Sequence, residues 1–573
     1  MKRTLAVILS LIMIFTFVPL CAFAADDTPL EVIVASDPQV SYLESESGPQ
    51  ERNTSELYNS AYGISPVMFA SRAALEAFLD KAAESSAKVV LIAGSLANGG
   101  FDGTETEPDS VITEAEERAL AERFATFARE TGKKVFVIDG ERDVKAENGR
   151  DEGISVAAFK EIWRQVTYVN AYAVDPDSCS YTADLDSNYR LIAIDTMSNK
   201  DSVLAWVESQ AAVAEAQGKR LIGLMSSSLI NHVPELMKDK VAFEDETLVR
   251  DFASWQIKYT FTGSVGANDI AVNSFNGSQA IYDVCTGSLT AFPATYRTVT
   301  FSNTVSLNSY FIDQIDTEGL HCSNQMSAAL ANSFTSYAKA FQAVGLGTYI
   351  EDQLTVDGAK EILMKKFSMR PAYYRNIFGT LDTTVPAIKE IINKPLYGEG
   401  DTFASIAADY EADIPEGLDY DTYETALIAV IQQVIHGDEQ VYSTSDLGKL
   451  ILNGAAVCIN YALSQLDSET FLLVLDDIAR RVSITLPANA QEYASDPVNR
   501  QMILQTVADG CAALFDLICV DANPADTYSY TLAGYDNYRD APVQTTVSIL
   551  ERLANFFNAI INFFRNLFSR FGG

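Results

Sequence analysis

The chain has 573 residues, with 41 Lys and Arg against 77 Asp and Glu, which gives a net charge of −36. This acidity argues against nucleic acid as a partner, because contacts to phosphate groups need clustered Lys and Arg. The length predicts roughly two to four domains, since domains run to about 100–200 residues. The three histidines, His232, His321 and His436, lie far apart in the sequence, which excludes a dense histidine metal cluster.

The first 24 residues have the pattern of a secretory signal peptide. Lys2 and Arg3 form a positive start, Leu5 to Phe17 is apolar, and Ala22-Phe23-Ala24 matches a small-x-small cleavage signal. We therefore predict cleavage after Ala24 and a protein that is secreted, extracellular or associated with the cell surface. A retained membrane anchor is the alternative. We expect no other transmembrane span.

The part expected to follow cleavage contains few cysteines for its length. The six are Cys179, Cys285, Cys322, Cys458, Cys511 and Cys519. This is sparse for a disulfide framework, so we expect at most one or two disulfides. Cys458 and Cys511 lie in apolar runs and are predicted to be core thiols.

Residues 25–305 are predicted to form an α/β domain. Short β-branched runs are expected strands at Glu31–Ser36, Lys88–Ala93, Lys134–Asp139, Tyr189–Asp195, Arg220–Met225, Lys258–Gly263 and Gln279–Cys285. Amphipathic segments at Phe69–Ser85, Glu114–Thr131 and Val203–Gln217 are expected helices, and Thr113 with Glu116 forms a capping box for the second. The acidic stretch from Asp102 to Glu117 is interpreted as a solvated loop and helix start. In such a sheet, functional loops follow the carboxyl ends of the strands.

Residues 306–545 are predicted to form a separate, mostly helical domain. Apolar residues recur at helical spacing in Gln325–Ala343, Asp357–Phe367, Tyr423–Ile435, Asp446–Leu463 and Phe471–Val482. The last segment, 546–573, is predicted to be an amphipathic helix, with three arginines against one glutamate and many phenylalanines. Within it, residues 548–571 fit either a membrane surface or partner groove, or a terminal helix packed on its own domain.

The expected strand ends carry a series of polar motifs. They are Ser36-Asp37-Pro38-Gln39, Gly94-Ser95-Leu96-Ala97-Asn98-Gly99, Gly140-Glu141-Arg142-Asp143, Met225-Ser226-Ser227-Ser228-Leu229 and Gly263-Ser264-Val265-Gly266-Ala267-Asn268-Asp269. Their order and context resemble the calcineurin-like metallophosphoesterase family, in particular secreted bacterial members. That family reads D-x-H, G-D, G-N-H-D/E, H and G-H-x-H, each just after a strand. The resemblance implies a metallophosphoesterase-like α/β sandwich followed by a mostly helical region.

The same resemblance shows that most of the metal-ligand positions are replaced. Asp37 keeps the first Asp of the family pattern, and Gln39 replaces its His partner. Ser95 replaces the bridging Asp, Glu141 replaces the ligand Asn, and Arg142 replaces the acid/base His. Ser226 replaces the downstream His, and Ser264 and Gly266 replace the two His of the last motif. Asp143 also matches, at a position that supports the acid/base His in the family. A Ser hydroxyl does not replace a carboxylate that bridges two cations, and water without paired metals is a poor nucleophile near neutral pH.

The remaining cleft is expected to be polar, and Asp143 and Asn98 are expected to line it. We expect no cofactor, although oxygen atoms of Asp37, Gln39, Glu141 and Asp143 leave weak binding of Ca²⁺ or Mg²⁺ open. Arg142 fits either a salt-bridged cleft or bidentate binding of a phosphate or carboxylate group.

We therefore predict a catalytically degenerate member of the metallophosphoesterase family that acts as a binding or scaffold protein with an unknown protein or surface partner. The alternatives are an active phosphoester hydrolase with an oxygen-ligand site and a purely structural envelope protein. His232, six residues past Ser226, is interpreted as a surface residue at a helix start. The sequence around Ser226–Ser228 lacks the G-x-S-x-G elbow of a Ser-His-Asp hydrolase.

Overall fold

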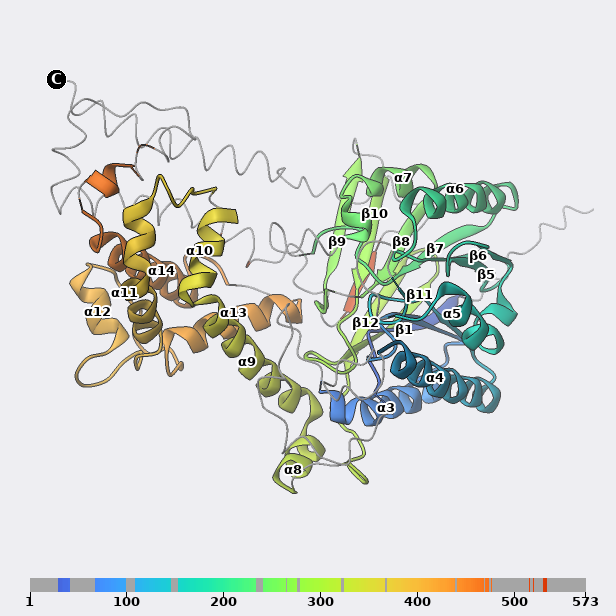
Figure 1. Ribbon diagram of the computed structural model, residues 1–573. Coiled ribbons are helices and arrows are strands. Elements are labelled where there is room, and N and C mark those ends of the chain that lie inside the picture. The colour runs from blue at the N-terminus through green and yellow to red at the C-terminus, as the bar shows by residue number, and fades with distance from the viewer. Residues whose placement is uncertain are drawn as a thin grey trace, which may run out of the picture.

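The computed structural model describes residues 29–41, 67–98, 109–145, 153–232, 241–263, 265–275, 279–320, 324–365, 368–437, 441–467 and 469–473, together with 476, 515, 519 and 529–532. The predicted signal peptide and the predicted terminal helix lie outside these residues. The structure confirms an α/β fold built on two sheets and followed by a mostly helical region (Figure 1).

The first sheet has six strands in the order β13-β12-β11-β1-β2-β3. They are β1 (Leu30–Ser36), β2 (Val89–Ala93), β3 (Lys134–Val137), β11 (Thr295–Phe301), β12 (Val305–Phe311) and β13 (Ser529–Leu532). Strands β1, β2 and β3 are parallel, and Ser36 at the end of β1 pairs with Ala93 at the end of β2. All five residues of β2 are buried, which explains its continuous apolar sequence.

The second sheet has seven strands in the order β4-β5-β6-β7-β8-β10-β9. They are β4 (Ala173–Val174), β5 (Tyr181–Asp184), β6 (Tyr189–Ile194), β7 (Arg220–Met225), β8 (Ile257–Thr262), β9 (Ile270–Phe275) and β10 (Gln279–Cys285). The four central strands, β6, β7, β8 and β10, are parallel. Their carboxyl ends therefore lie at one edge of the sheet.

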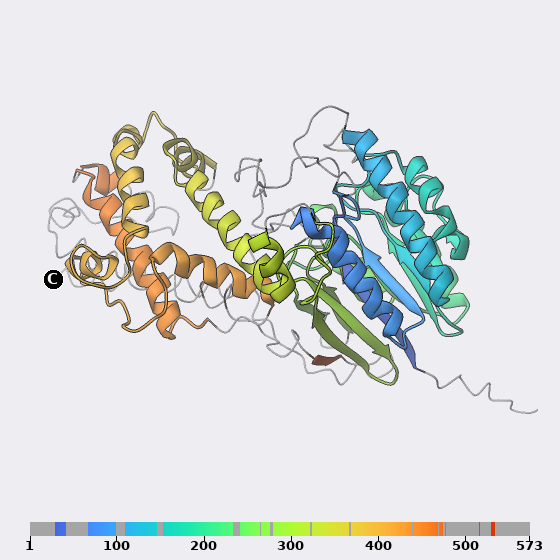
Figure 2. The same cartoon turned by 90° about the horizontal axis from the view of Figure 1, so that it is seen from below.

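Helices cover the outer face of each sheet. They are α3 (Ser71–Glu84), α4 (Asp109–Thr131) and α5 (Val156–Ile162) beside the first sheet, and α6 (Lys200–Ala216) and α7 (Leu248–Ser254) on the second (Figures 1 and 2). One buried apolar cluster joins α3, α4 and both sheets, and another joins the second sheet to α6 and α7. The result is a four-layer sandwich. Short 3-10 turns occur at Met68–Ala70, Trp163–Gln165, Tyr168–Asn170 and Ala242–Glu244.

Helix α4 corrects two expectations from the sequence. It begins at Asp109, so Thr113 lies inside the helix and does not cap its start. Glu116 and Glu117 are buried, so the acidic stretch is not solvated throughout. Leu120 and Phe124, which follow on the same helix, are fully buried in the core. The face of α4 that carries them also carries Glu117 into the interior.

The C-terminal region contains seven described helices. They are α8 (Asn324–Asn332), α9 (Phe334–Gln353), α10 (Val356–Lys365), α11 (Arg375–Ile392), α12 (Phe403–Asp409), α13 (Tyr423–His436) and α14 (Asp446–Ser464). The predicted helix at Gln325–Ala343 is divided, because the Ser333 side chain accepts a hydrogen bond from the amide of Ser336 and starts α9. Helix α11 was not predicted; it contains Pro386. The first sheet also extends past residue 305, the predicted end of the α/β domain, because β12 pairs with β11 and with β13.

Helices α9 and α13 meet the α/β part at the same end (Figures 1 and 2). The ring of His436 stacks on both Phe292 and Phe311, and the amide of Asn268 donates to Ile435 O at 3.0 Å. Phe334 and Phe341 of α9 belong to the apolar cluster that contains the first sheet. The two regions are therefore in direct contact.

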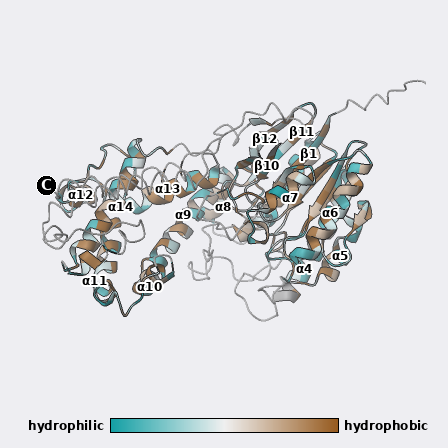
Figure 3. Cartoon of the chain, turned by 90° about the horizontal axis from the view of Figure 1, so that it is seen from above, coloured by the Kyte–Doolittle hydropathy of each residue, from teal (hydrophilic) through white to brown (hydrophobic). Residues whose placement is uncertain are grey.

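Helix α14 is the one described helix long and apolar enough to cross a membrane, by length and composition. It contacts α11, α12 and α13, and the OH group of Tyr423 in α13 donates to Ile451 O at 2.7 Å. These contacts are those of a helix packed within the helical region. Figure 3 shows both hydrophobic and hydrophilic residues along α9, α11 and α14.

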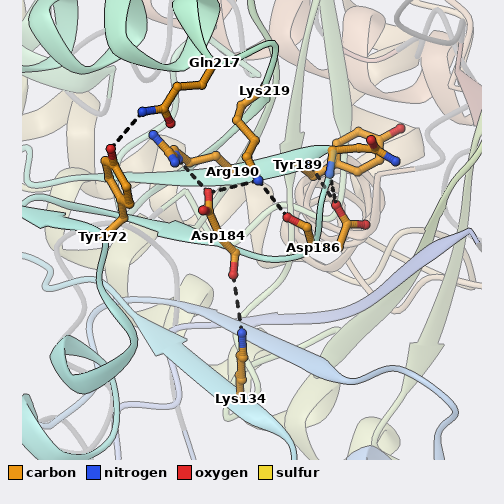
Figure 4. A network of polar contacts seen from close by, with 9 residues as sticks. Lys134, Tyr172, Asp184, Asp186, Tyr189, Arg190, Gln217 and Lys219 are labelled. Carbon is orange, nitrogen blue, oxygen red and sulfur yellow. Dashed lines mark hydrogen bonds and ion pairs between the residues drawn. The ribbon is translucent and has the colours of Figure 1, made fainter. Parts of the chain in front are cut away.

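A polar network joins the two sheets at the end opposite to the strand ends that carry the motifs (Figure 4). The fully buried Arg190 donates to Asp184 Oδ1 at 2.7 Å and lies over the ring of Tyr172. Lys134 of the first sheet donates to Asp184 O at 3.4 Å, and Lys219 donates to Asp186 O at 2.9 Å.

Candidate functional site

The loops after β2 and β3 are brought together by two glycines. A Cβ atom on Gly94 would lie 2.6 Å from Gly140 N, and a Cβ atom on Gly140 would lie 2.7 Å from Ser95 N. Such distances leave no room for a side chain at either position. The close approach brings Ser95, Asn98 and Arg142 together at the carboxyl edge of the first sheet, where the sequence predicts a cleft. We keep the name cleft for this group of residues.

Asp37 lies at the centre of this cleft, after β1, and is 3% exposed. Its Oδ1 accepts a hydrogen bond from Ser95 N at 2.6 Å, and its Oδ2 lies so close to Gly263 that a Cβ atom there would overlap it. The main chain of Asp37 has a φ of 42°, which is rare for a residue other than glycine. It is held there because Asp37 N donates to Ala93 O and Ser288 Oγ donates to Asp37 O.

Asp143 is fully buried and holds the floor of the cleft. Its carboxylate accepts hydrogen bonds from the amides of Leu96 at 2.9 Å, Ala97 at 3.0 Å and Gly140 at 2.8 Å. Burial raises its pKa, and these amide donors oppose that rise. The carboxylate is therefore committed to main-chain donors of both motif loops.

Glu117 of α4 is a buried residue of the site that the sequence analysis assigned to a solvated stretch. Burial, followed by the charge of Asp143, raises the pKa of Glu117 well above its ordinary value. The Nε1 of Trp163 donates to Glu117 Oε2 at 2.6 Å. The helical spacing of Glu117 with Leu120 and Phe124 was the available signal for its burial.

Arg142, which the motif resemblance aligns with an acid/base His, has its guanidinium group beside Asn98. Its Nη1 donates to Asn98 Oδ1 at 3.3 Å, and its amide donates to Ser95 Oγ at 3.4 Å. Glu141 next to it is partly exposed. Gln39 has a φ of 42° and is 8% exposed, and its Oε1 is buried with no hydrogen-bond donor among the described residues.

The second sheet contributes hydroxyl groups to the same region. Ser226 Oγ lies 3.0 Å from Thr196 Oγ1, which also lies 3.1 Å from Ser227 Oγ. Gly263 N donates to Ser226 O at 3.1 Å, so Gly263 links this group to Asp37. Gly266 has a φ of 72°. Ser264 lies outside the described residues.

The interpretation of His232 as a surface residue is wrong. Its side chain is fully buried, with Nδ1 2.6 Å from Asp269 Oδ2 and Nε2 3.2 Å from Asp283 Oδ2. Burial alone would lower the pKa of His232, but the two aspartates together outweigh burial and raise it to about 10. Asp283 also accepts from the amides of Leu229 and Ile230 at 2.6 and 2.9 Å. The imidazolium ion thus fixes the loop after β7 and is not a base.

The described cysteines are reduced. Cys179, Cys285 and Cys519 are buried thiols, and Cys458 is a half-buried one. Cys322 and Cys511 lie outside the described residues. Cys458 was predicted to be a core thiol, and the structure shows it partly buried. Burial raises the pKa of its thiol to about 12.

The residues of the cleft do not fit a two-metal centre. Such a centre needs two cations about 3.5–4 Å apart with imidazole and bridging carboxylate ligands. Here the one histidine of the described strand-end loops, His232, lies between Asp269 and Asp283, and the guanidinium group of Arg142 contacts Asn98. The bridging position carries a hydroxyl group.

Comparison with known proteins gives a distant likeness in fold. A dimetal phosphatase from Danio rerio is 8% identical over 49% of this chain and 96% of that chain, with a TM-score of 0.35. A second solved structure is 14% identical over 48% of this chain and 95% of that chain, with a TM-score of 0.29. No protein-family model and no curated protein matches the chain. Likeness at this level carries no argument about activity; the fold class rests on the two sheets themselves.

Proposed function

We propose that the chain is a catalytically degenerate, metallophosphoesterase-like protein whose cleft serves as a binding or scaffold unit. The observation that carries this proposal is the kind of side chain at the strand ends. Ser95, whose amide donates to Asp37, offers a hydroxyl group where a two-metal hydrolase needs a bridging carboxylate. The histidine of the described strand-end loops, His232, is held by Asp269 and Asp283. Arg142 adds a fixed positive charge, which favours an anionic group and disfavours two cations.

The test is a hydrolysis assay with phosphomonoester and phosphodiester substrates. Each is incubated with purified protein and added Mn²⁺, Zn²⁺, Fe²⁺, Mg²⁺ or Ca²⁺. We expect the same rate from the wild type and from Asp37→Ala, at the level of buffer with metal. Metal-dependent turnover that Asp37→Ala abolishes would contradict the proposal.

A second candidate is a hydrolase or sensor with one Ca²⁺ or Mg²⁺ on oxygen ligands. The unpartnered, buried Oε1 of Gln39, two residues after Asp37, is the observation that favours it. Calorimetric titration with Ca²⁺ and Mg²⁺ distinguishes the two. Binding that Gln39→Leu abolishes and Gln217→Leu leaves unchanged supports this candidate, since Gln217 follows the C-terminal end of α6 and contacts Tyr172 (Figure 4).

We also propose that the protein is secreted and associates with a surface through residues 548–571. The support is the sequence pattern: an N-terminal signal, and a Phe-rich segment with three arginines in an otherwise acidic chain. A liposome co-sedimentation assay with anionic vesicles tests it. Deletion of residues 548–573 is expected to release the protein into the supernatant, and equal sedimentation of both forms would refute surface association through this segment.

A further inference from the structure

Behind the cleft lies a second cluster of ligand-type side chains that the motif series does not include. Asp139 follows β3, Cys179 precedes β5 and Asp195 follows β6, so the cluster draws on both sheets. All three residues are fully buried, and one ligand atom from each lies within 4.8 Å of the other two.

The carboxyl group of Asp195 has a defined set of donors. It accepts from the amides of Cys179 at 2.9 Å and Met197 at 2.7 Å, and from Ser198 Oγ at 2.6 Å. These donors fix the orientation of the Asp195 carboxyl group. Met197 and Ser198 lie on the loop after β6, and Cys179 lies just before β5.

Asp139 has no comparable set of donors. Among the described residues, no amine or hydroxyl group donates to its buried carboxyl oxygens, which face the carboxyl group of Asp195. A buried carboxyl group without a donor costs several kcal/mol unless it is neutralised by a proton or by a cation. No salt bridge to Asp139 or Asp195 occurs in the described part of the chain.

We propose that Asp139, Cys179 and Asp195 form a buried site for one divalent transition metal of the zinc type. A thiolate with two carboxylates supplies the S and O ligands that Zn²⁺ accepts, at about 2.3 Å for sulfur and about 2.0–2.2 Å for oxygen. Ligand atoms already within 4.8 Å of one another need to move only slightly to reach such distances. Because β3 and β6 belong to different sheets, the metal would tie the two sheets together.

The surface beside the cluster offers a route for the metal. A groove is lined by residues of α5, by Val174 and by Tyr168. The OH group of Tyr168 donates to Cys179 O at 2.9 Å, so this side chain contacts both the groove and the cluster. Tyr168 therefore separates the groove from Cys179.

The competing explanation is a proton shared by Asp139 and Asp195. Burial and the neighbouring Asp195 raise the pKa of Asp139 well above its ordinary value, and a proton on Asp139 would also neutralise the pair. Asp139→Asn separates the two explanations, because an amide imitates the protonated carboxyl group but is a poor zinc ligand.

The experiment is metal analysis of the full-length protein, purified without chelators and dialysed against zinc. We expect about one tightly bound zinc per chain in the wild type, and a loss of at least about tenfold in affinity in Cys179→Ser and in Asp139→Asn. Cys285→Ser, which removes another fully buried thiol, is the matched control and should keep the zinc. With Co²⁺ in place of zinc, thiolate-to-cobalt charge-transfer absorption should appear in the wild type and in Cys285→Ser only.

Three results would overturn the inference. The first is less than about a tenth of an equivalent of zinc in the dialysed wild type. The second is equal zinc content in the wild type and Cys179→Ser. The third is an Asp139→Asn protein as stable as the wild type with and without EDTA, which assigns a shared proton to the pair. If a variant does not fold, Co²⁺ absorption of the wild type still decides whether a thiolate binds metal.

Discussion

Asp143 shows at the scale of one residue how the loops after β2 and β3 are held together. Its carboxylate accepts hydrogen bonds from the amides of Leu96 and Ala97 in one loop and of Gly140 in the other. Next to it, burial and the charge of Asp143 raise the pKa of Glu117.

Replacing Asp143 with alanine is therefore expected to destabilise the fold. Three buried amides would lose their acceptor, and each unsatisfied group costs about 1–3 kcal/mol, so the free energy of unfolding should fall by about 3 kcal/mol or more. Urea denaturation measures this change. Asp201→Ala, which removes an exposed carboxylate from the first turn of α6, is the control and should change stability by less than about 1 kcal/mol. Similar losses in both variants would contradict the role given to Asp143.

His232 leads to a prediction about pH. Its pKa is about 10 in the folded chain, against about 6.5 in an unfolded chain. Folding therefore takes up a proton between these values, and the stabilisation by the imidazolium ion, complete below about pH 6.5, is lost as pH rises through about 10.

The free energy of unfolding should accordingly fall between pH 7 and pH 10 by roughly one kcal/mol per pH unit from this group. His232→Gln removes the titrating group but leaves Asp269 and Asp283 in place. Urea denaturation at several pH values should show a smaller slope for the variant than for the wild type. Parallel curves for the two proteins would show that His232 does not carry this dependence.

At the scale of elements, α13 joins the helical region to the α/β part. Gly437 ends α13 with a φ of 89°, and a Cβ atom there would overlap the carbonyl of Asn268. Next to it, His436 stacks between Phe292 and Phe311, and burial lowers its pKa. The ring thus joins the end of α13 to aromatic side chains of the α/β part.

Gly437→Ala is expected to weaken this junction. Gly417 is a matched control, since its φ is 81° but nothing lies within 4 Å of a Cβ atom there. In both variants the alanine must adopt a positive φ, which destabilises the fold by about 1 kcal/mol. Only in Gly437→Ala does the added Cβ atom also displace the loop that contains Asn268. Limited proteolysis should cleave Gly437→Ala faster than Gly417→Ala between the two regions. Equal cleavage rates would remove the case for a tight contact at Asn268.

Several elements could be predicted from the sequence because their signals are local. Strands β1, β2, β6 and β7 are short apolar runs, and α13 and α14 have helical periodicity, so their expected bounds agree with the structure within about two residues. Edge strands such as β4 and β13 escaped prediction, because two or four residues carry little periodicity and their pairing is set by distant parts of the chain.

The site shows the same division between local and distant causes. The order of the motifs located Asp37, Ser95, Asn98, Arg142 and Asp143, because parallel strands end at one edge. The predictions for His232 and Glu117 were wrong, because their burial depends on distant residues. His232 contacts aspartates 37 and 51 residues further along the chain. Glu117 lies against Asp143 and Trp163. Glycine is required at positions 94 and 140 because the two loops touch there, and this requirement does not depend on which ligand residues lie nearby.

For the whole molecule, two sheets pack face to face and their strand-end loops meet at one edge. Positive φ angles at Asp37 and Gln39 and the close approach of Gly94 to Gly140 shape these loops. Hydrogen bonds from loop amides to Asp37 and Asp143 hold the loops after β1, β2 and β3 together. The central proposal is that these loops do not bind a pair of metal ions.

The most direct measurement of this claim is Mn²⁺ binding followed by electron paramagnetic resonance, on the wild type and on Asp37→Ala. Two metals about 3.5–4 Å apart would give a spin-coupled signal. The account predicts no coupled signal and the same Mn²⁺ binding curve for both proteins. A coupled signal from two Mn²⁺ per chain that disappears in Asp37→Ala would contradict it.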